Sequence, residues 1–434
     1  MSNGDALDLY RDGLKVGRLF DEQPLRFAYD DAWIAHPDAG PISPSIPLVQ
    51  GDQSTEAVHA FFENLLPEGH VRKFLQASRH ATTVFGLLRS VGGDTASGLT
   101  ILPRGEVPQP ARYRPVTWPE IAARLQQTGV PALVAENVEG TRISLAGAQD
   151  KLLLTVMPDG SPALPEGAAP STHILKPDIR GLDGVWASAL NEALVMQLAA
   201  ALGLGVALAV YQPETRACLI QRYDRMPDGL GGLRRLHQLD LCQLAGKPSN
   251  VKYESDGGPT LLDCRKLLAA TGVGGPDVKR FLQWILFNLM VGNNDSHAKN
   301  LSVLLDGDGK YVLAPFYDLM CTAIYPGSSA RFAFAIGGED KPGAIGKDQL
   351  DAMASDLGFN PRYVAAVAQS LVGALPDALA QVNARLWDEA RLGTERTLLE
   401  RLTRWIATNT RKHAKRWGLN PSRRVRAPGR TCAD

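Results

Sequence analysis

The first residues of the chain alternate apolar and polar side chains, which is the period of a half-buried strand. Residues 7–20 carry this alternation on both sides of Asp12-Gly13, a pair that favours a type I′ hairpin turn. From Thr55 to Leu66 the apolar residues change to helical spacing, and Pro67 ends that segment. The chain is therefore predicted to begin as sheet and to continue into a helix.

Short β-like runs dominate the next part of the sequence. Residues 98–102 read as a strand, and the proline-rich residues 103–115 read as a linker that closes a first unit near residue 105. One helix is predicted at residues 187–202. Around it, strands are expected at residues 151–156, 172–176, 207–211 and 217–223.

After residue 236 helical periodicity prevails, most clearly at residues 278–291, 363–374 and 398–410. A β-rich part followed by a helical part predicts an α+β protein with the two-lobed plan of kinases. The predicted domains are an N-terminal subdomain at 1–105, an N-lobe with phosphate loop and hinge at 106–235, and a helical C-lobe at 236–434.

Composition places the chain among globular proteins. Its 434 residues are 44% hydrophobic and 21% charged, and this length exceeds what one core usually covers. The sequence has no run of about 18 apolar residues and does not start like a signal peptide, so we expect a cytoplasmic protein with no membrane partner. The five cysteines are scattered without a CxxC pair, which predicts idle or buried thiols.

A net charge of zero hides a basic C-terminal segment. Residues 401–434 hold ten Lys or Arg and one acidic residue, Asp434. Such a segment attracts a phosphate backbone or an acidic partner, although a solvated helix face explains it equally well.

A polar loop between two apolar elements carries the candidate chemistry. Asp295 and Asn300 lie five positions apart, the spacing of the base and the metal-binding asparagine in the protein-kinase loop HRDxxxxN. The following strand pair, turning at residues 306–309, is expected to return Asp318 to this loop. One carboxylate base and hard oxygen ligands for magnesium are what phosphoryl transfer requires from a protein.

Two upstream features fit phosphate binding. A turn of small residues, 144–148, lies between two apolar runs and would let backbone amides approach phosphates, although a plain hairpin is the alternative. Lys176 ends a strand-like run, as does the kinase lysine that contacts the nucleotide phosphates, although a solvent-facing lysine would look the same.

Taken together, these strings resemble the HipA family of bacterial toxin kinases over nearly the whole chain. The strings are SPSIPL (43–48), FFENLLPEG (61–69), VGGDTASGLTIL (91–102), RISLAGAQDK (142–151), THILKP (172–177), QRYDR (221–225), VKYESDGGP (251–259), GNNDSHAKN (292–300) and APFYDL (314–319).

The resemblance implies a serine/threonine-protein kinase with bound ATP and Mg²⁺. It assigns Asp295 as the catalytic base and Asn300 and Asp318 as magnesium ligands. It also implies a nucleotide site made of Ala146, Gly147, Ala148, Gln149, Lys151, Lys176, Gln221, Arg222, Tyr223, His297, Lys299, Asn300, Tyr317 and Asp318.

Ser144 matches the serine that family members autophosphorylate, after which the phosphate loop is expelled. A phosphoserine brings roughly two negative charges into a loop meant for anionic phosphates, so repulsion favours an open loop. An unmodified turn serine is the alternative.

The sequence departs from the family in two places. The hinge reads Gln221-Arg222-Tyr223 where Glu and Phe are frequent, and the catalytic loop reads Asn293-Asn294-Asp295 where Ala-Thr-Asp is frequent. Neither departure removes a group that the chemistry needs, so an active kinase is expected.

The family also implies the partners: a small helix-turn-helix antitoxin, operator DNA bound through it, and a protein substrate from the aminoacyl-tRNA synthetase class. Two other functions stay open from the residues alone. One is a lipid or small-molecule kinase, which shares the catalytic set. The other is a non-catalytic DNA co-repressor, against which the presence of Asp295, Asn300 and Asp318 counts.

Overall fold

The computed structural model describes residues 5–126, 147, 149–229 and 232–420, which form two compact units. Unit 1 consists of Met1–Ile179, Ala207–Gly274 and His297–Pro315, and unit 2 consists of Arg180–Val206, Gly275–Ser296 and Phe316–Asp434. The chain thus passes between the units several times. The domain boundaries at residues 105 and 235 stay predictions.

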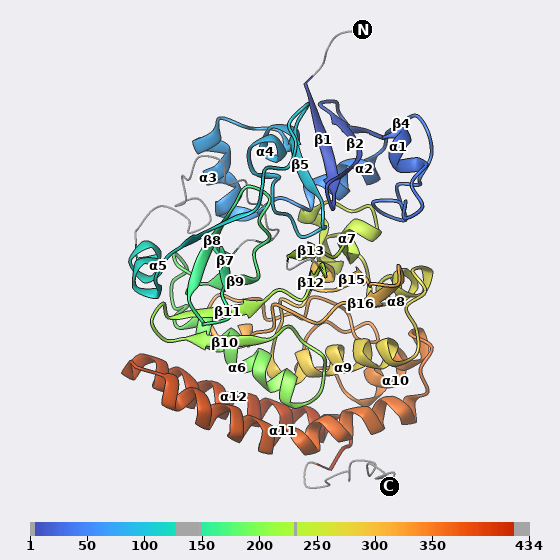
Figure 1. Ribbon diagram of the computed structural model, residues 1–434. Coiled ribbons are helices and arrows are strands. Elements are labelled where there is room, and N and C mark those ends of the chain that lie inside the picture. Colours follow the sequence, from blue (N-terminus) through green and yellow to red (C-terminus); the bar gives the residue numbers. More distant parts are fainter. Residues whose placement is uncertain (1–4, 127–146, 148, 230–231, 421–434) are drawn as a thin grey trace, which may run out of the picture. The chain divides into compact units, whose positions relative to one another are not determined.

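Unit 1 begins with a five-stranded antiparallel sheet in the order β4-β3-β2-β1-β5 (Figure 1). The predicted hairpin is confirmed, since β1 pairs with β2 and both Asp12 and Gly13 have positive φ, 49° and 81°. The strands are β1 (Ala6–Arg11), β2 (Leu14–Phe20), β3 (Arg26–Tyr29), β4 (Asp52–Ser54) and β5 (Thr100–Pro103).

The predicted first long helix is α2 (Glu56–Glu63), which begins where Thr55 caps the backbone N–H of Val58. Phe61 and Phe62 on its inner face are fully buried with ring centroids 5.0 Å apart. Burying one such side chain contributes roughly 1.5–3 kcal/mol. The neighbouring helices are α1 (Asp31–Ile34), α3 (Gly69–Arg79) and α4 (Val84–Val91).

A second, six-stranded sheet in unit 1 has the order β10-β11-β9-β7-β8-β6. Its strands are β6 (Arg112–Pro115), β7 (Leu152–Val156), β8 (Pro162–Glu166), β9 (His173–Lys176), β10 (Ala209–Gln212) and β11 (Ala217–Gln221). The interpretation of residues 103–115 as a linker is wrong at its end, because β6 pairs with β8. Pro115 is tolerated there because β6 is an edge strand. Helix α5 (Trp118–Leu125) follows β6 and was not predicted.

Two smaller sheets complete unit 1. The predicted turn at residues 306–309 is confirmed, since Leu305 pairs with Tyr311 across it and Asp306 accepts hydrogen bonds from the backbone of Asp308 and Lys310. The elements are β12 (Arg225–Pro227), β13 (Leu233–Arg235), β14 (Gln238–Asp240), α7 (Leu241–Leu244), α8 (Leu261–Ala270), β15 (Ser302–Leu305) and β16 (Tyr311–Leu313).

Unit 2 is helical in the described residues. Its helices are α6 (Ser188–Ala201), α9 (Pro276–Val291), α10 (Lys347–Asp356), α11 (Pro361–Glu389) and α12 (Gly393–Arg416). Helices α11 and α12 lie side by side, and α11 also contacts α6 and α9 (Figure 1). Helix α11 continues through Pro376, beyond residues 363–374 where the helical periodicity is clearest, because Leu379, Val382 and Leu386 extend its buried face.

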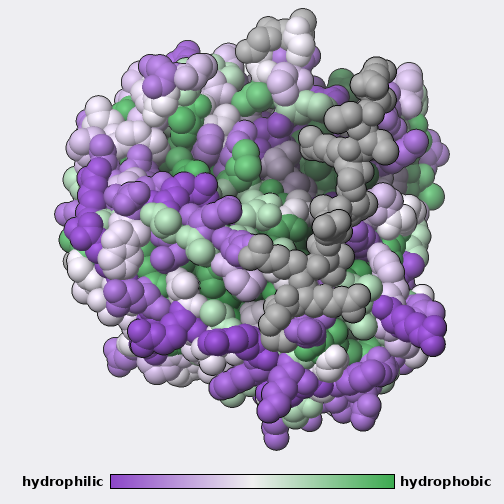
Figure 2. Space-filling model, turned by 90° about the horizontal axis from the view of Figure 1, so that it is seen from below, coloured by the Kyte–Doolittle hydropathy of each residue, from purple (hydrophilic) through white to green (hydrophobic). Residues whose placement is uncertain are grey.

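By length and composition, α11 is the one helix in the described part of the chain that could cross a membrane. A core helix of a water-soluble protein meets the same criterion, and ten side chains of α11 are buried within the protein. Figure 2 shows one face of the molecule, on which hydrophilic residues surround smaller groups of hydrophobic ones.

Gly292 ends α9 in the left-handed conformation, with φ of 70°, and a Cβ there would lie 2.1 Å from the Trp405 ring. We predict that Gly292→Ala lowers the free energy of unfolding by about 2–5 kcal/mol, from backbone strain plus overpacking. Gly203→Ala is the matched control: its φ is 74°, but nothing lies within 4 Å of the added Cβ. It should cost only about 1 kcal/mol in denaturant titrations, from strain alone. Equal decreases in the free energy of unfolding for Gly292→Ala and Gly203→Ala would show that the contact with Trp405 is unimportant.

Candidate active site

Two of the predicted phosphate-binding lysines lie at the same end of the six-stranded sheet. Leu152 of β7 pairs with Leu175 of β9, so Lys151 and Lys176 are neighbours at the ends of paired antiparallel strands. Each lysine is only 7% exposed. Two positive charges that are largely out of water therefore lie at this end of the sheet.

Gly147 lies under one of these lysines. Its φ is 107°, and a Cβ there would be 2.9 Å from the Lys151 Nζ, so only glycine fits without displacing the lysine. Gln149 Nε2 donates to the carbonyl of Pro177, the residue after Lys176, over 3.3 Å. The turn predicted to bind phosphate is thus tied to both strand ends. Ser144, Ala146 and Ala148 lie outside the described residues.

The N-terminal part of unit 1 contacts this turn directly. Pro67 forms a parallel bridge with Gly147, and the Glu68 backbone N–H donates to the Gly147 carbonyl over 3.0 Å. The Glu68 carboxylate in turn accepts a hydrogen bond from Lys252 Nζ at 2.7 Å. Glu68 belongs to the family-like string at residues 61–69, but no role for it could be predicted from the sequence.

Lys299 is buried among acidic and amide groups of unit 1. Its Nζ donates to Asp240 Oδ2 at 3.0 Å and to Asn64 Oδ1, and lies 3.8 Å from Glu68 Oε1. Burial lowers the pKa of Lys299, but the Asp240 and Glu68 carboxylates outweigh burial and raise it overall. The ammonium therefore stays charged and holds its loop to the start of α7. Its role in the nucleotide pocket stays a prediction.

The rest of that loop is also buried. The His297 ring packs edge-on against Tyr253, with centroids 5.0 Å apart. Asn300 closes a short 3₁₀ turn by donating its backbone N–H to the His297 carbonyl at 2.9 Å. Both side chains are about 5–6% exposed, so the loop presents them from a fixed backbone.

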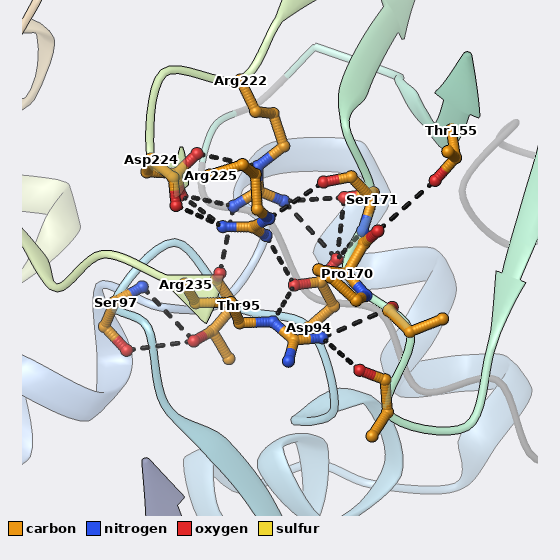
Figure 3. A network of polar contacts seen from close by, with 12 residues as sticks. Asp94, Thr95, Ser97, Thr155, Pro170, Ser171, Arg222, Asp224, Arg225 and Arg235 are labelled. Carbon is orange, nitrogen blue, oxygen red and sulfur yellow. Dashed lines mark hydrogen bonds and ion pairs between the residues drawn. The ribbon is translucent and has the colours of Figure 1, made fainter. Parts of the chain in front are cut away.

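A buried network of charges surrounds the predicted hinge (Figure 3). Asp94 Oδ1 accepts from Arg225 at 2.8 Å and from Arg235 at 3.0 Å, and Asp94 Oδ2 lies 3.6 Å from Arg222. Ser171 Oγ donates to Asp94 Oδ2 at 2.8 Å. Burial alone would raise the pKa of Asp94, but the three arginines outweigh it and hold the pKa far below its usual range.

Arg222, one of the predicted hinge residues, is committed to this network. Its guanidinium donates to both carboxylate oxygens of Asp224, at 3.0 and 2.7 Å, and to the Thr95 carbonyl. Its backbone N–H donates to Thr172 over 2.9 Å. Gln221 ends β11 exposed, and Tyr223 follows Arg222 half-buried. Adenine contact by this segment stays a prediction, and the Arg222 side chain has a structural role.

Asp295 belongs to unit 2 and follows a firmly anchored turn. Asn293 donates its backbone N–H to the Asn288 carbonyl and its Nδ2 to Asn288 Oδ1, both at 2.9 Å. Asn288 Nδ2 in turn donates to Trp284 within α9. The Asp295 loop therefore leaves α9 in a direction fixed by a chain of amide hydrogen bonds.

Asp318 also belongs to unit 2 and has a positive φ of 60°, a conformation uncommon for residues other than glycine. Phe316 and Leu319 on either side are at most 1% exposed, and the half-buried Tyr317 lies between. The Ala323 backbone N–H, shortly after, donates to the Gly292 carbonyl at 3.0 Å. This bond ties the segment that follows Asp318 to Gly292, three residues before Asp295. The approach of the Asp318 side chain to the Asp295 loop stays a prediction.

The donor set fits magnesium rather than a softer metal. Asn300 in unit 1 offers an amide oxygen and Asp318 in unit 2 a carboxylate, and Mg²⁺ in nucleotide sites takes one or two such ligands besides phosphate oxygens and water. That both residues hold one ion stays a prediction. Within the described ranges, no group of three or more His, Cys, Asp or Glu side chains could hold a metal by itself.

Strand lysines, a glycine turn and a catalytic-loop aspartate are the features of an α+β protein with the kinase-like fold. Comparisons with known proteins agree. Residues 143–379 match the HipA-like C-terminal domain and residues 7–102 match the HipA N-terminal domain. The chain therefore belongs to the HipA family.

Two curated relatives cover most of the chain. A putative kinase, Y4mE of Sinorhizobium fredii, is 36% identical over 87% of this chain and 91% of its own length. The serine/threonine-protein kinase toxin HipA of Shewanella oneidensis is 31% identical over 87% of this chain and 89% of its own length. A solved complex of Shewanella oneidensis HipA, HipB and operator DNA superposes with a TM-score of 0.80 at 26% identity, covering 95% of this chain and 98% of that one.

Asp94 yields a testable prediction, because it compensates three buried arginines. We expect Asp94→Asn to lower the free energy of unfolding at pH 7 by roughly 3–5 kcal/mol. The folded-state pKa of Asp94 is depressed, so its contribution is present above the unfolded pKa near 4 and is lost as pH falls further. The gap between wild type and variant should therefore narrow from pH 7 to pH 3 in urea titrations.

The control is Asp52→Asn, which removes an exposed carboxylate paired with Arg26 at 2.7 Å. That substitution should cost about 0–1 kcal/mol. A loss of that size for Asp94→Asn would contradict the role given to the network.

Proposed function

We propose that this chain is an ATP- and Mg²⁺-dependent serine/threonine-protein kinase that acts as the toxin of a toxin-antitoxin pair in the cytoplasm. The observation that carries the proposal is the hydrogen bond between Ala323 and Gly292, which supports a position of Asp318 near the loop of Asp295. The relative of Shewanella oneidensis, named a serine/threonine-protein kinase toxin, supports the acceptor class.

In the proposed reaction, the Asp295 carboxylate accepts the proton of the substrate hydroxyl while the hydroxyl oxygen attacks the γ-phosphorus of ATP. The bond from the γ-phosphorus to the β,γ-bridging oxygen breaks, and ADP leaves. Lys151 and Lys176 bind phosphate oxygens and balance their charge. Magnesium, held by Asn300 and Asp318, would neutralise charge that develops on the phosphates. Adenine is bound along residues 221–223, through backbone groups rather than through the Arg222 guanidinium.

Control of the kinase by autophosphorylation forms part of the proposal. Ser144 is the acceptor, and its phosphate would be repelled by the nucleotide phosphates that Gly147 and its neighbours bind. The contact of Gly147 with Pro67 and Glu68 supports this, because loss of that bridge would release the turn from the N-terminal part of unit 1. Phosphorylated protein would then no longer bind ATP.

The proposed partners follow from the relatives. The solved complex contains HipB and operator DNA, which supports a helix-turn-helix antitoxin and operator binding for this chain. The proposed substrate is an aminoacyl-tRNA synthetase, whose phosphorylation would inhibit translation.

The first test is mass spectrometry of the purified protein after incubation with magnesium ATP. We expect phosphate on Ser144 in the wild type and in neither Asp295→Asn nor Asp318→Asn, since the first variant lacks the base and the second a metal ligand. Asp308→Asn, at the exposed turn between β15 and β16, is the matched control and should be modified like the wild type. Bound ATP without any phosphorylation would favour a co-repressor that has kept only the pocket.

A second test concerns DNA. Arg411 and Lys412 are exposed on α12, and phosphate contacts from them would release counterions. The double variant Arg411→Gln, Lys412→Gln should reduce the slope of log affinity against log salt by about 1–2 for operator DNA bound with the antitoxin. Lys347→Gln on α10 should leave the slope unchanged. An unaltered slope in the double variant would remove α12 from the interface.

A further inference from the structure

The Thr322 hydroxyl joins two segments of unit 2 that carry the proposed catalytic residues. Thr322 Oγ1 accepts the backbone N–H of Asn294 at 2.9 Å and donates to the Gly292 carbonyl at 3.3 Å. The Gly292 carbonyl also accepts the backbone N–H of Ala323. One hydroxyl therefore closes a clamp of three hydrogen bonds, which we call the 292/322 clamp.

The segment that carries Thr322 is itself held firmly. Asn191 of α6 exchanges two hydrogen bonds with the backbone of Cys321, at 3.0 and 2.9 Å. Arg401 of α12 donates to the Ile324 carbonyl at 2.9 Å, and its guanidinium lies over the Trp186 ring. Two helices thus fix the backbone on both sides of Thr322, so its hydroxyl is a fixed reference point for the loop.

On the other side of the clamp, the Asn294 side chain adds a further anchor to the hydrogen bonds of Asn293 with Asn288. Asn294 Nδ2 donates to the Ser329 carbonyl at 2.7 Å, and the residue is 6% exposed. Asn294 directly precedes Asp295, and Thr322 follows Asp318 by four residues. A shift of the Asn294 backbone would therefore move Asp295 relative to the segment of Asp318.

We propose that Thr322 is a positioning residue for phosphoryl transfer, which sets the Asp295 loop against the segment of Asp318 through its hydroxyl. This inference rests on the proposed kinase function. In this role Thr322 contacts no reacting atom. Loss of its hydroxyl would change the rate of the chemical step through the position of Asp295. A displacement of reacting groups by about 1 Å can lower a rate by about 100-fold.

The test compares Thr322→Val, which keeps the side-chain shape and loses both hydrogen bonds, with Thr322→Ser, which keeps the hydroxyl. Single-turnover incorporation of labelled phosphate is measured against ATP concentration. We expect the maximal rate of Thr322→Val to fall about 10- to 100-fold with the half-saturating ATP concentration within about twofold of the wild type. Thr322→Ser should stay within about threefold in both.

Three kinetic outcomes would overturn the inference. The first is a wild-type maximal rate in Thr322→Val. The second is an equal decrease of the maximal rate in Thr322→Ser and Thr322→Val. The third is a change of only the half-saturating ATP concentration in Thr322→Val. The first would show that the clamp does not matter, the second that shape rather than the hydroxyl matters, and the third that Thr322 acts on nucleotide binding.

Amide hydrogen exchange gives a readout that does not need activity. Thr322→Val leaves the Asn294 N–H without its acceptor, so exchange of that amide should rise at least about tenfold, while Thr322→Ser retains protection. Unchanged exchange in Thr322→Val would show that the clamp is absent. A wild-type protein that incorporates no phosphate would overturn the proposed kinase function. The positioning role of Thr322 would fall with it, whatever amide hydrogen exchange shows for the clamp.

Discussion

The buried carboxylate of Asp94 links parts of unit 1 that lie far apart in the sequence. A charge with no access to water is tolerated only beside opposite charge, and Asp94 meets this demand with Arg222, Arg225 and Arg235. These partners lie 128 to 141 residues away in sequence, beyond β11 and in the β12-β13 pair. The segment after α4 is thereby fixed to the six-stranded sheet. Pro67 and Glu68, in the same part of the chain, can then contact Gly147 from a stable position.

Unit 2 is tied together differently around the proposed base. The groups that hold residues 288–294 and 321–324 are neutral amides, carbonyls and a hydroxyl, with Arg401 at the edge. A neutral hydrogen bond contributes about 1 kcal/mol net, whereas a broken buried ion pair costs several times more. The loop of Asp295 is thus held in place by hydrogen bonds, each of which costs little free energy to break and form again. Weak bonds suit the role proposed for this loop, which binds and releases substrates. The charged network of Asp94 suits a part of unit 1 that keeps one conformation.

The sequence predicted those elements whose signal is local. The hairpin at Asp12-Gly13 and the turn at residues 306–309 carry their own backbone preferences, and α9 shows its apolar face and its terminal Gly292. Helix α11 extends past residues 363–374, where its periodicity is clearest, because a continuous buried face outweighs the one hydrogen bond that Pro376 removes. Strand β6 was missed because its pairing with β8 depends on residues about 50 positions away.

The same distinction applies to the candidate site. Asp295 and Asn300 were predicted from their spacing and Asp318 from the strand pair before it, because a kinase catalytic loop is short and its chemistry needs particular side chains. Their roles stay predictions. Thr322, Asp240 and Asp94 could not be selected, because each matters through a partner distant in sequence.

The backbone of Asp318 shows a further reason why the geometry of a site can be only partly predicted from a sequence. A non-glycine residue at φ of 60° costs free energy, and no local pattern here calls for it. The burial of Phe316 and Leu319 on either side offsets that cost and fixes the conformation. Glycine would relieve the strain but would remove the carboxylate, so the left-handed conformation of Asp318 fits the magnesium-binding role proposed for that carboxylate.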